Sequence, residues 1–301
     1  MDTLSSILNT FRLQVEIIHN VQYCGDWAVD TSGVRHASFH IVTHGECFVS
    51  AESLEEPVLL KTGDFVLFPH DEKHVLKALP NSSATPNQQT PYDYSEGTIE
   101  KGTGLLCGYF QFDHPASNPL LEALPEVLIK HREQLSAECP IGDLLTLIQA
   151  ESLHEQPGSR AAMNRLTESL FILIVREYLS SAQQSKGLAA ALTDSRIKSV
   201  LNAIHAQPEK RWTLEQLATA GSMSRSAFSS LFKSLLNESV MDYLQRWRMQ
   251  NAWNWLQQGE TVYSVAQRCG YESDAAFAKA FKKVMGMGPG AVRKQQKSQL
   301  Q

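Results

Sequence analysis

One pattern, present twice near the C-terminal end, restricts the fold of this chain more than any other. The two copies read GSMSRSAFSSLFK, beginning at Gly221, and CGYESDAAFAKAFKK, beginning at Cys269. In each, a polar turn leads into two phenylalanines four residues apart, which lie on the same face of a helix. A short amphipathic segment precedes each copy, LEQLATA in the first and TVYSVAQR in the second. Helix, tight turn and second helix, repeated, predict two helix-turn-helix units.

The charge of the chain is divided near residue 196. Residues 196–301 hold 15 Lys and Arg against 7 Asp and Glu, a net charge of +8, whereas residues 1–195 carry −13. A basic region in an acidic protein suggests a polyanion as its partner, although a solvated basic face would give the same balance. Because both helix-turn-helix units lie inside the basic region, the combination favours DNA.

The segment MDYLQRWRMQNAWNWLQQG joins the two units, and the chain closes with GMGPGAVRK. Together these features resemble the C-terminal DNA-binding domain of the AraC/XylS family of bacterial transcription regulators. Two departures are Asn237 and Val240, where the family usually has Gly and Pro. The resemblance implies sequence-specific binding to promoter DNA, RNA polymerase as a further partner, and a homodimer on paired half-sites. It leaves activation and repression equally open.

The resemblance also implies roles for the second helix of each unit. Such a helix enters the major groove, where its outward side chains meet base edges while Lys and Arg meet phosphates. A serine on such a face could equally be ordinary surface. The base-contacting candidates are Ser226, Ser229, Ser230, Asp274, Ala275, Ala278 and Lys279, and the phosphate-contacting candidates are Arg225, Lys233, Lys282 and Lys283.

The N-terminal part contains apolar segments separated by glycine turns. RHASFHIVTHGECFVSA, EPVLLKTGDFVLFPHDEKHVL and GLLCGYFQFDHP predict short strands. In this order they resemble the cupin β-barrel that precedes the DNA-binding domain in one branch of the AraC family. The polar stretch between them, residues 80–104, is predicted to be a flexible flap. The expected fold class is α+β, with a cupin-like sensor barrel at 1–115, helices for connection or dimerisation at 116–186, a linker at 187–195, and two helix-turn-helix units joined by a linker helix at 196–297.

Two pairs of residues are candidate sites in this part of the chain, one for detecting a signal and one for binding a metal. Cys24 and Cys107 are each followed by glycine, and the resemblance to cupin-type regulators implies a response to an oxidant or electrophile. Against this, no basic residue adjoins either cysteine, which favours inert thiols. His40 and His74 lie on different predicted strands and could share a divalent metal, as in enzymatic cupins, but the compact His-x-His and Glu motif is missing. We therefore expect no obligatory cofactor.

Two classes of function remain open. In the first, the chain is a transcription regulator whose N-terminal domain senses an oxidant or a small effector. In the alternative, a cupin metalloenzyme is fused to a DNA-binding domain. No nucleophile and base are recognisable by spacing, so we expect a protein that is not an enzyme. The chain has no apolar run of 18 residues, no basic and apolar leader and no C-x-x-C pair among its five cysteines, so we expect a cytoplasmic protein without membrane contact.

Overall fold

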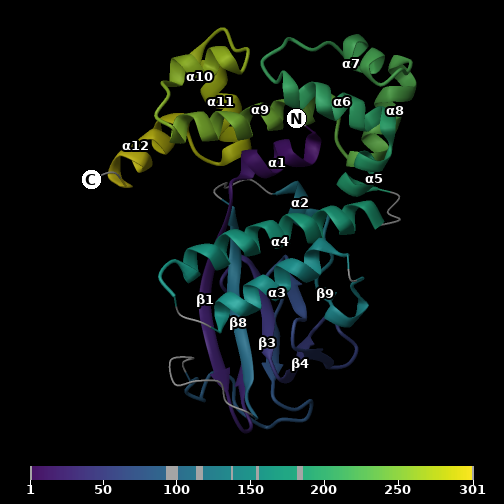
Figure 1. The fold of residues 1–301 in the computed structure, drawn as a ribbon. Helices are drawn as coiled ribbons and strands as arrows, with labels where there is room; N and C mark the ends of the chain where they lie inside the picture. Colours follow the sequence, from purple (N-terminus) through teal and green to yellow (C-terminus); the bar gives the residue numbers. More distant parts are fainter. Residues whose placement is uncertain are drawn as a thin grey trace. The chain divides into compact units, whose positions relative to one another are not determined.

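A computed structural model describes residues 2–92, 101–112, 118–136, 138–153, 156–181 and 186–299, with side chains described up to residue 294. The chain forms two compact units (Figure 1). The sheet unit comprises residues 13–111 and 124–178, and the helical unit comprises residues 1–12, 112–123 and 179–301. The expected domain boundaries follow the order of the chain, whereas each unit is assembled from separated segments.

Two sheets form the sheet unit (Figure 1). The five-stranded sheet has the order β1 (Leu13–Tyr23), β8 (Thr103–Phe112), β3 (Ala37–His44), β6 (Phe65–Phe68) and β9 (Leu128–Lys130). The four-stranded sheet has the order β2 (Ala28–Val29), β7 (His74–Lys77), β4 (Glu46–Ala51) and β5 (Val58–Lys61). Strand β3 is antiparallel to both β6 and β8, and β4 is antiparallel to both β5 and β7.

The two sheets share one apolar core. Val42, Phe68 and Leu105 contribute to it from the five-stranded sheet, and Cys47 and Leu60 contribute from the four-stranded sheet. The α+β fold class with an antiparallel N-terminal part is confirmed. Among the described residues the cupin-like part is a pair of sheets, and no described ladder closes the two sheets into a barrel. Residues 93–100 of the predicted flap lie outside the described residues.

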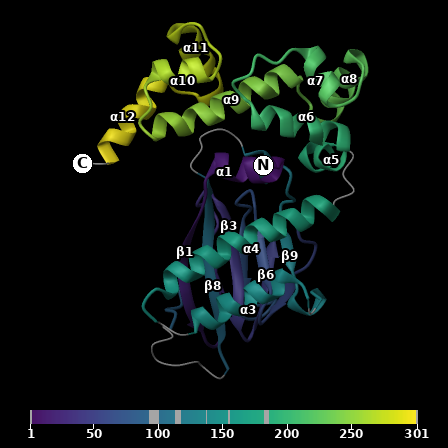
Figure 2. The same cartoon turned by 45° about the horizontal axis from the view of Figure 1, so that its top comes forward.

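Helices cover one face of the five-stranded sheet. Both α3 (Pro140–Ser152) and α4 (Ser159–Ser181) cross this face in Figures 1 and 2. The ring of Phe171 on α4 lies 4.5 Å from that of Phe110 on β8. Leu170 and Ile174 on the same helix are fully buried. This part of α4 therefore packs within its own unit.

The helical unit contains the predicted helix-turn-helix segments and two helices that we did not expect there. The first is α1 (Thr3–Phe11) and the second is α5 (Gly187–Thr193). Residues 187–195 are thus not an open linker: Leu188, Ala189 and Ala191 are buried, and α5 packs on α6 and α8. The alanines of this segment have a high helix propensity, which favours a helix that begins at Gly187. The remaining helices are α2 (Pro119–Glu122), α6 (Ser195–Ala206), α7 (Leu214–Ala220), α8 (Arg225–Leu236), α9 (Val240–Gln257), α10 (Val262–Arg268), α11 (Asp274–Met285) and α12 (Pro289–Gln299). Within the described ranges, no helix has the length and apolar character needed to cross a membrane.

Candidate functional sites

The first helix-turn-helix unit consists of α7 and α8. The hydroxyl of Thr213 accepts a hydrogen bond from the backbone N–H of Gln216 at 3.2 Å, and the Gln216 side chain accepts one from the Thr213 N–H at 3.1 Å. This reciprocal pair is a capping box, which fixes where α7 begins. Phe228 and Phe232 of α8 are fully buried, with ring centroids 5.7 Å apart. The aromatic pair thus turns the polar face of α8 outward.

The second unit, α10 and α11, repeats this construction. Thr261 caps α10 and Ser273 caps α11, each hydroxyl accepting a backbone hydrogen bond from the first helical turn. Phe277 and Phe281 are fully buried, and the ring of Phe281 stacks on that of Trp253 on α9. The predicted repeat of the helix-turn-helix unit is therefore present in the structure.

Helix α9 joins the two units. Its 18 residues span about 27 Å at 1.5 Å per residue. Its residues Leu244, Trp247 and Leu256 are all buried. Asn237, where the family usually has Gly, ends α8 in the left-handed region with φ of 56°. Asn tolerates this conformation better than most residues, which explains how it can replace Gly here.

The predicted DNA-contacting residues lie on the outward faces of α8 and α11. Ala278 is half-buried and all the others are exposed. Arg225 differs from the other predicted phosphate contacts because its guanidinium forms a 2.7 Å ion pair with Glu215. Exposed ion pairs of this kind contribute little to the free energy of folding, so a DNA phosphate can replace the Glu215 carboxylate as the partner of Arg225. The outward residues are Arg225, Ser226, Ser229, Ser230 and Lys233 on α8, and Asp274, Ala275, Ala278, Lys279, Lys282 and Lys283 on α11.

Sequence patterns did not reveal the contacts that connect the two helix-turn-helix units. Arg248 of α9 donates hydrogen bonds to the backbone oxygens of Pro208, at 2.6 Å, and Lys210, at 2.8 Å, in the loop before α7. From the same loop, Arg211 forms a 3.0 Å ion pair with Glu272, which precedes α11. These partners are 38 to 61 residues apart in the chain, so no local periodicity signals them.

In the sheet unit, the structure brings His40 and His74 together. Their Nε2 atoms are 2.9 Å apart, and the hydroxyl oxygen of Thr31 lies 3.2 Å from the first and 3.1 Å from the second. The Nδ1 of His74 is 2.7 Å from the backbone oxygen of Glu72, which only accepts, so this nitrogen carries a proton. In the neutral ring, Nε2 of His74 is then the acceptor for the Nε2–H of His40. Burial and the neighbouring His74 hold the pKa of His40 well below its usual value.

This histidine pair does not fit a resident metal. Zinc sites use three or four protein ligands. The described residues contain no group of three or more His, Cys, Asp and Glu side chains placed for an ion. Two imidazoles and one hydroxyl, already hydrogen-bonded to one another, form a buried polar cluster instead.

The two cysteines proposed to detect a signal have contrasting environments. Cys24 follows β1 and is exposed, whereas Cys107 on β8 is 2% exposed. Burial raises the pKa of Cys107 to about 12, which keeps this thiol protonated at neutral pH. Because the thiolate is the reactive form, Cys107 is protected from oxidants in this conformation. Cys47 and Cys269 are also buried, with exposures of 0% and 1%.

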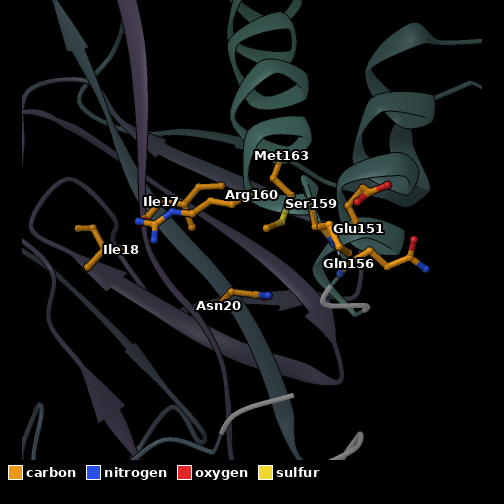
Figure 3. Close-up of a pocket in the computed structure, with 9 residues that line it drawn as sticks. Ile17, Ile18, Asn20, Glu151, Gln156, Ser159, Arg160 and Met163 are labelled. Carbon is orange, nitrogen blue, oxygen red and sulfur yellow. Dashed lines mark hydrogen bonds between the residues drawn. The ribbon is translucent and has the colours of Figure 1, made fainter. Parts of the chain in front are cut away.

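The sheet unit also contains a pocket of about 490 Å³ between β1 and the residues around the start of α4 (Figure 3). Ile17, Ile18 and Met163 give it apolar walls, and Asn20 and Arg160 add polar groups. One nitrogen of the Arg160 guanidinium donates to the backbone oxygen of Ile17 at 3.1 Å. Glu151, Gln156 and Ser159 add further polar groups to the lining, and a pocket of this size can accommodate a small ligand. Its residues come from distant parts of the chain, so the sequence alone did not indicate it.

Comparisons with known proteins match both parts of the chain. Residues 2–180 match a family model described as "Cupin", and residues 217–295 match one described as "Helix-turn-helix domain". An AraC-like transcription regulator of Streptomyces lividans is 29% identical over 300 residues, which cover 98% of both chains. The HTH-type transcriptional regulator AlkR of Acinetobacter baylyi is 30% identical, over 98% of this chain and 100% of its own. The RCS-specific HTH-type transcriptional activator RclR of Escherichia coli is 28% identical, over 97% of each chain.

Proposed function

This chain belongs to the AraC/XylS family of transcription regulators, with an N-terminal cupin domain and a C-terminal helix-turn-helix DNA-binding domain, and from that premise we propose how it works. As a homodimer in the cytoplasm it binds promoter DNA through α8 and α11 and alters the access or activity of RNA polymerase there. A chemical signal received by the sheet unit controls this binding. The observation that carries the proposal is the pair of capped helices with buried phenylalanines and exposed polar faces, in a region of net charge +8.

The geometry supports separate base-contacting and phosphate-contacting residues on each recognition helix. Ser226, Ser229 and Ser230 share one face of α8, and such small hydroxyls can donate to or accept from any base edge. On α11, Lys279 is the long exposed donor, suited to the O6 and N7 acceptors of guanine. The flanking residues Lys233 and Lys282 lie toward the C-terminal ends of their helices, where a phosphate offers the nearest partner.

The full chain should bind duplex DNA with a steep dependence on salt. Each phosphate neutralised by Lys or Arg releases condensed counterions, so affinity should fall by about 10³ or more between ~50 and ~200 mM salt if six or more phosphates are contacted. Fluorescence anisotropy with a duplex selected from a random-sequence library measures this slope. Binding that is independent of salt would contradict the proposed interface.

For the signal, we propose an oxidant or electrophile that reacts at Cys24. This thiol is exposed, whereas burial keeps Cys107 protonated and unreactive until the sheet unit opens. The name of the relative described as RCS-specific, which matches along the whole chain, supports a reactive chemical as the signal. The pocket beside β1 supports a second candidate, a small reversible effector bound among Ile17, Ile18 and Arg160.

A further inference from the structure

The N-terminal helix α1 packs inside the helical unit, although the sequence placed it with the sensor domain. Asp2 caps the helix by accepting a hydrogen bond from the Ser5 N–H at 3.0 Å. Ile7 and Phe11 are fully buried, and α1 packs against α6 and α9. Burying two large apolar side chains stabilises this contact relative to leaving them exposed. The helix is therefore an integral part of the helical unit.

Hydrogen bonds hold both ends of α1 to different helices. At its beginning, the Thr3 hydroxyl donates to the side-chain oxygen of Asn202 on α6 at 2.7 Å. At its end, the side-chain nitrogen of Asn254 on α9 donates to the backbone oxygen of Thr10 at 2.6 Å. All four residues are buried or half-buried, so each bond is shielded from water and costly to leave unmade.

The two anchored helices, α6 and α9, pack on different helix-turn-helix units. Helix α6 packs on α7 of the first helix-turn-helix unit. Asn254 lies in the C-terminal part of α9, next to Trp253 and Leu256, which share a core with Phe277 and Phe281 of the second unit. From Thr3 to Thr10 the helix rises about 10 Å. It thus forms a further connection between the two units, besides α9 and the contacts of Arg248 and Arg211.

We propose that α1 is a brace that fixes the orientation of the two helix-turn-helix units, with Thr3, Asn202 and Asn254 as positioning residues for DNA binding. Two recognition helices reach successive major-groove faces only when their separation and angle match the duplex. A unit that already holds this arrangement loses less conformational freedom on binding, which raises its affinity. The inference rests on the DNA binding proposed above and adds a contribution from outside the matched helix-turn-helix region.

The test uses the full-length chain and two duplexes. The first is the best duplex selected from a random-sequence library, and in the second one of its two major-groove sites is replaced by unrelated sequence. Asn254→Ala and Thr3→Val each remove one hydrogen bond of the brace. Asn251→Ala is the matched control, since its side-chain nitrogen donates to the backbone oxygen of Trp247 within α9 itself.

Asn254→Ala and Thr3→Val should weaken binding to the two-site duplex by roughly threefold to tenfold, the effect of one buried hydrogen bond. Binding to the one-site duplex and helicity by circular dichroism should stay at the wild-type level, and Asn251→Ala should change neither affinity. An equal loss on both duplexes, or no loss on either, would overturn the brace. A wild-type chain that binds neither duplex would instead overturn the proposed function and remove the premise of the brace.

Discussion

His205 lies in the core of the helical unit as an uncharged ring. Its ring centroid lies 3.8 Å from that of Trp247, and its Nε2 lies at hydrogen-bond distance, 2.8 Å, from the Tyr243 hydroxyl oxygen. Burial, followed by the nearby charge of Arg246, lowers its pKa to about 3. Below pH ~6.5 the unfolded chain takes up a proton that the folded unit refuses, so folding stability present above that pH is lost as the pH falls.

The free energy of unfolding should therefore fall between pH 7.5 and 5.5, with His205 contributing at most about 1.4 kcal/mol per pH unit. Urea unfolding followed by tryptophan fluorescence at the two pH values measures this. His205→Gln should reduce the pH dependence, and the control His70→Gln, at an exposed position, should not. An unchanged slope in His205→Gln would show that other groups dominate.

Substitutions of the outward residues of α8 and α11 should have two kinds of effect on DNA binding. Ser229→Ala and Lys279→Ala remove proposed base contacts, so each should cost about 1–3 kcal/mol at particular base positions and relax the preference there. Lys233→Ala should weaken binding to all sequences alike and make the salt slope shallower. Competitive binding to a library of single-base variants measures both effects. A uniform loss for all three variants would contradict the assignment.

At this scale, residues whose role is local were predictable from the sequence. The caps Thr213 and Ser224 and the pair Phe228 and Phe232 follow from spacing within one helix. The ion pair of Arg225 with Glu215 depends on how two consecutive helices pack. The sequence offered His40 and His74 only as a candidate pair, and their approach depends on how separate strands pack. Neither periodicity nor residue type carries that information.

At the scale of elements, amphipathic helices were predicted best. Helices α8 and α11 have strong 3.6-residue periodicity and lie where the sequence placed them. Strand β9 has only three residues, too few to show alternation, and the sequence assigned it to a helical region. Helix α5 was mistaken for a linker because its glycine and small residues are also typical of flexible segments.

Helix α5 should stabilise the first recognition helix, because it packs on α8 and buries Leu188 to 5% exposure. Leu188→Ala removes this packing and leaves a cavity, so the free energy of unfolding of the helical unit should fall by about 2–5 kcal/mol. Differential scanning calorimetry would show a lower Tm for this variant, whereas Thr193→Ala, at an exposed position on the same helix, serves as the control. Equal Tm values for Leu188→Ala and the wild type would restore the interpretation of residues 187–195 as a linker.

At the scale of the molecule, the chain passes repeatedly between its two units. The boundaries fall after residues 12, 111, 123 and 178. Helix α1 ends at Phe11 with Arg12 as its C-cap, and Leu13 begins β1, the strand that contributes Ile17, Ile18 and Asn20 to the pocket. Because the chain passes between the units several times, more than one covalent connection can transmit a conformational change from the sheet unit to the DNA-binding helices. Regulation requires only that the signal stabilise one conformation of these connecting segments over another.

Promoter output under an oxidant tests which residue receives the signal. If the exposed Cys24 is the sensor, Cys24→Ser should abolish the response to hypochlorite or an electrophile, because the thiol that forms the sulfenic acid or adduct is gone. Cys107→Ser should reduce the response only if Cys107 acts after Cys24, since its burial raises its pKa to about 12. Reporter expression in wild type, the two single variants and the double variant measures the response.

The pocket provides the competing outcome of this experiment. A full response in the Cys24→Ser, Cys107→Ser double variant would contradict cysteine sensing and favour a reversible effector beside β1. Ile18→Trp then gives the second test, because Ile18 lines the pocket and is 42% exposed, so a larger ring there fills the pocket without entering the core. Loss of the response in Ile18→Trp with retained DNA binding would assign the signal to the pocket. A response that survives both the double cysteine variant and Ile18→Trp would reject both proposed sensors and leave only the DNA-binding part of the proposal standing.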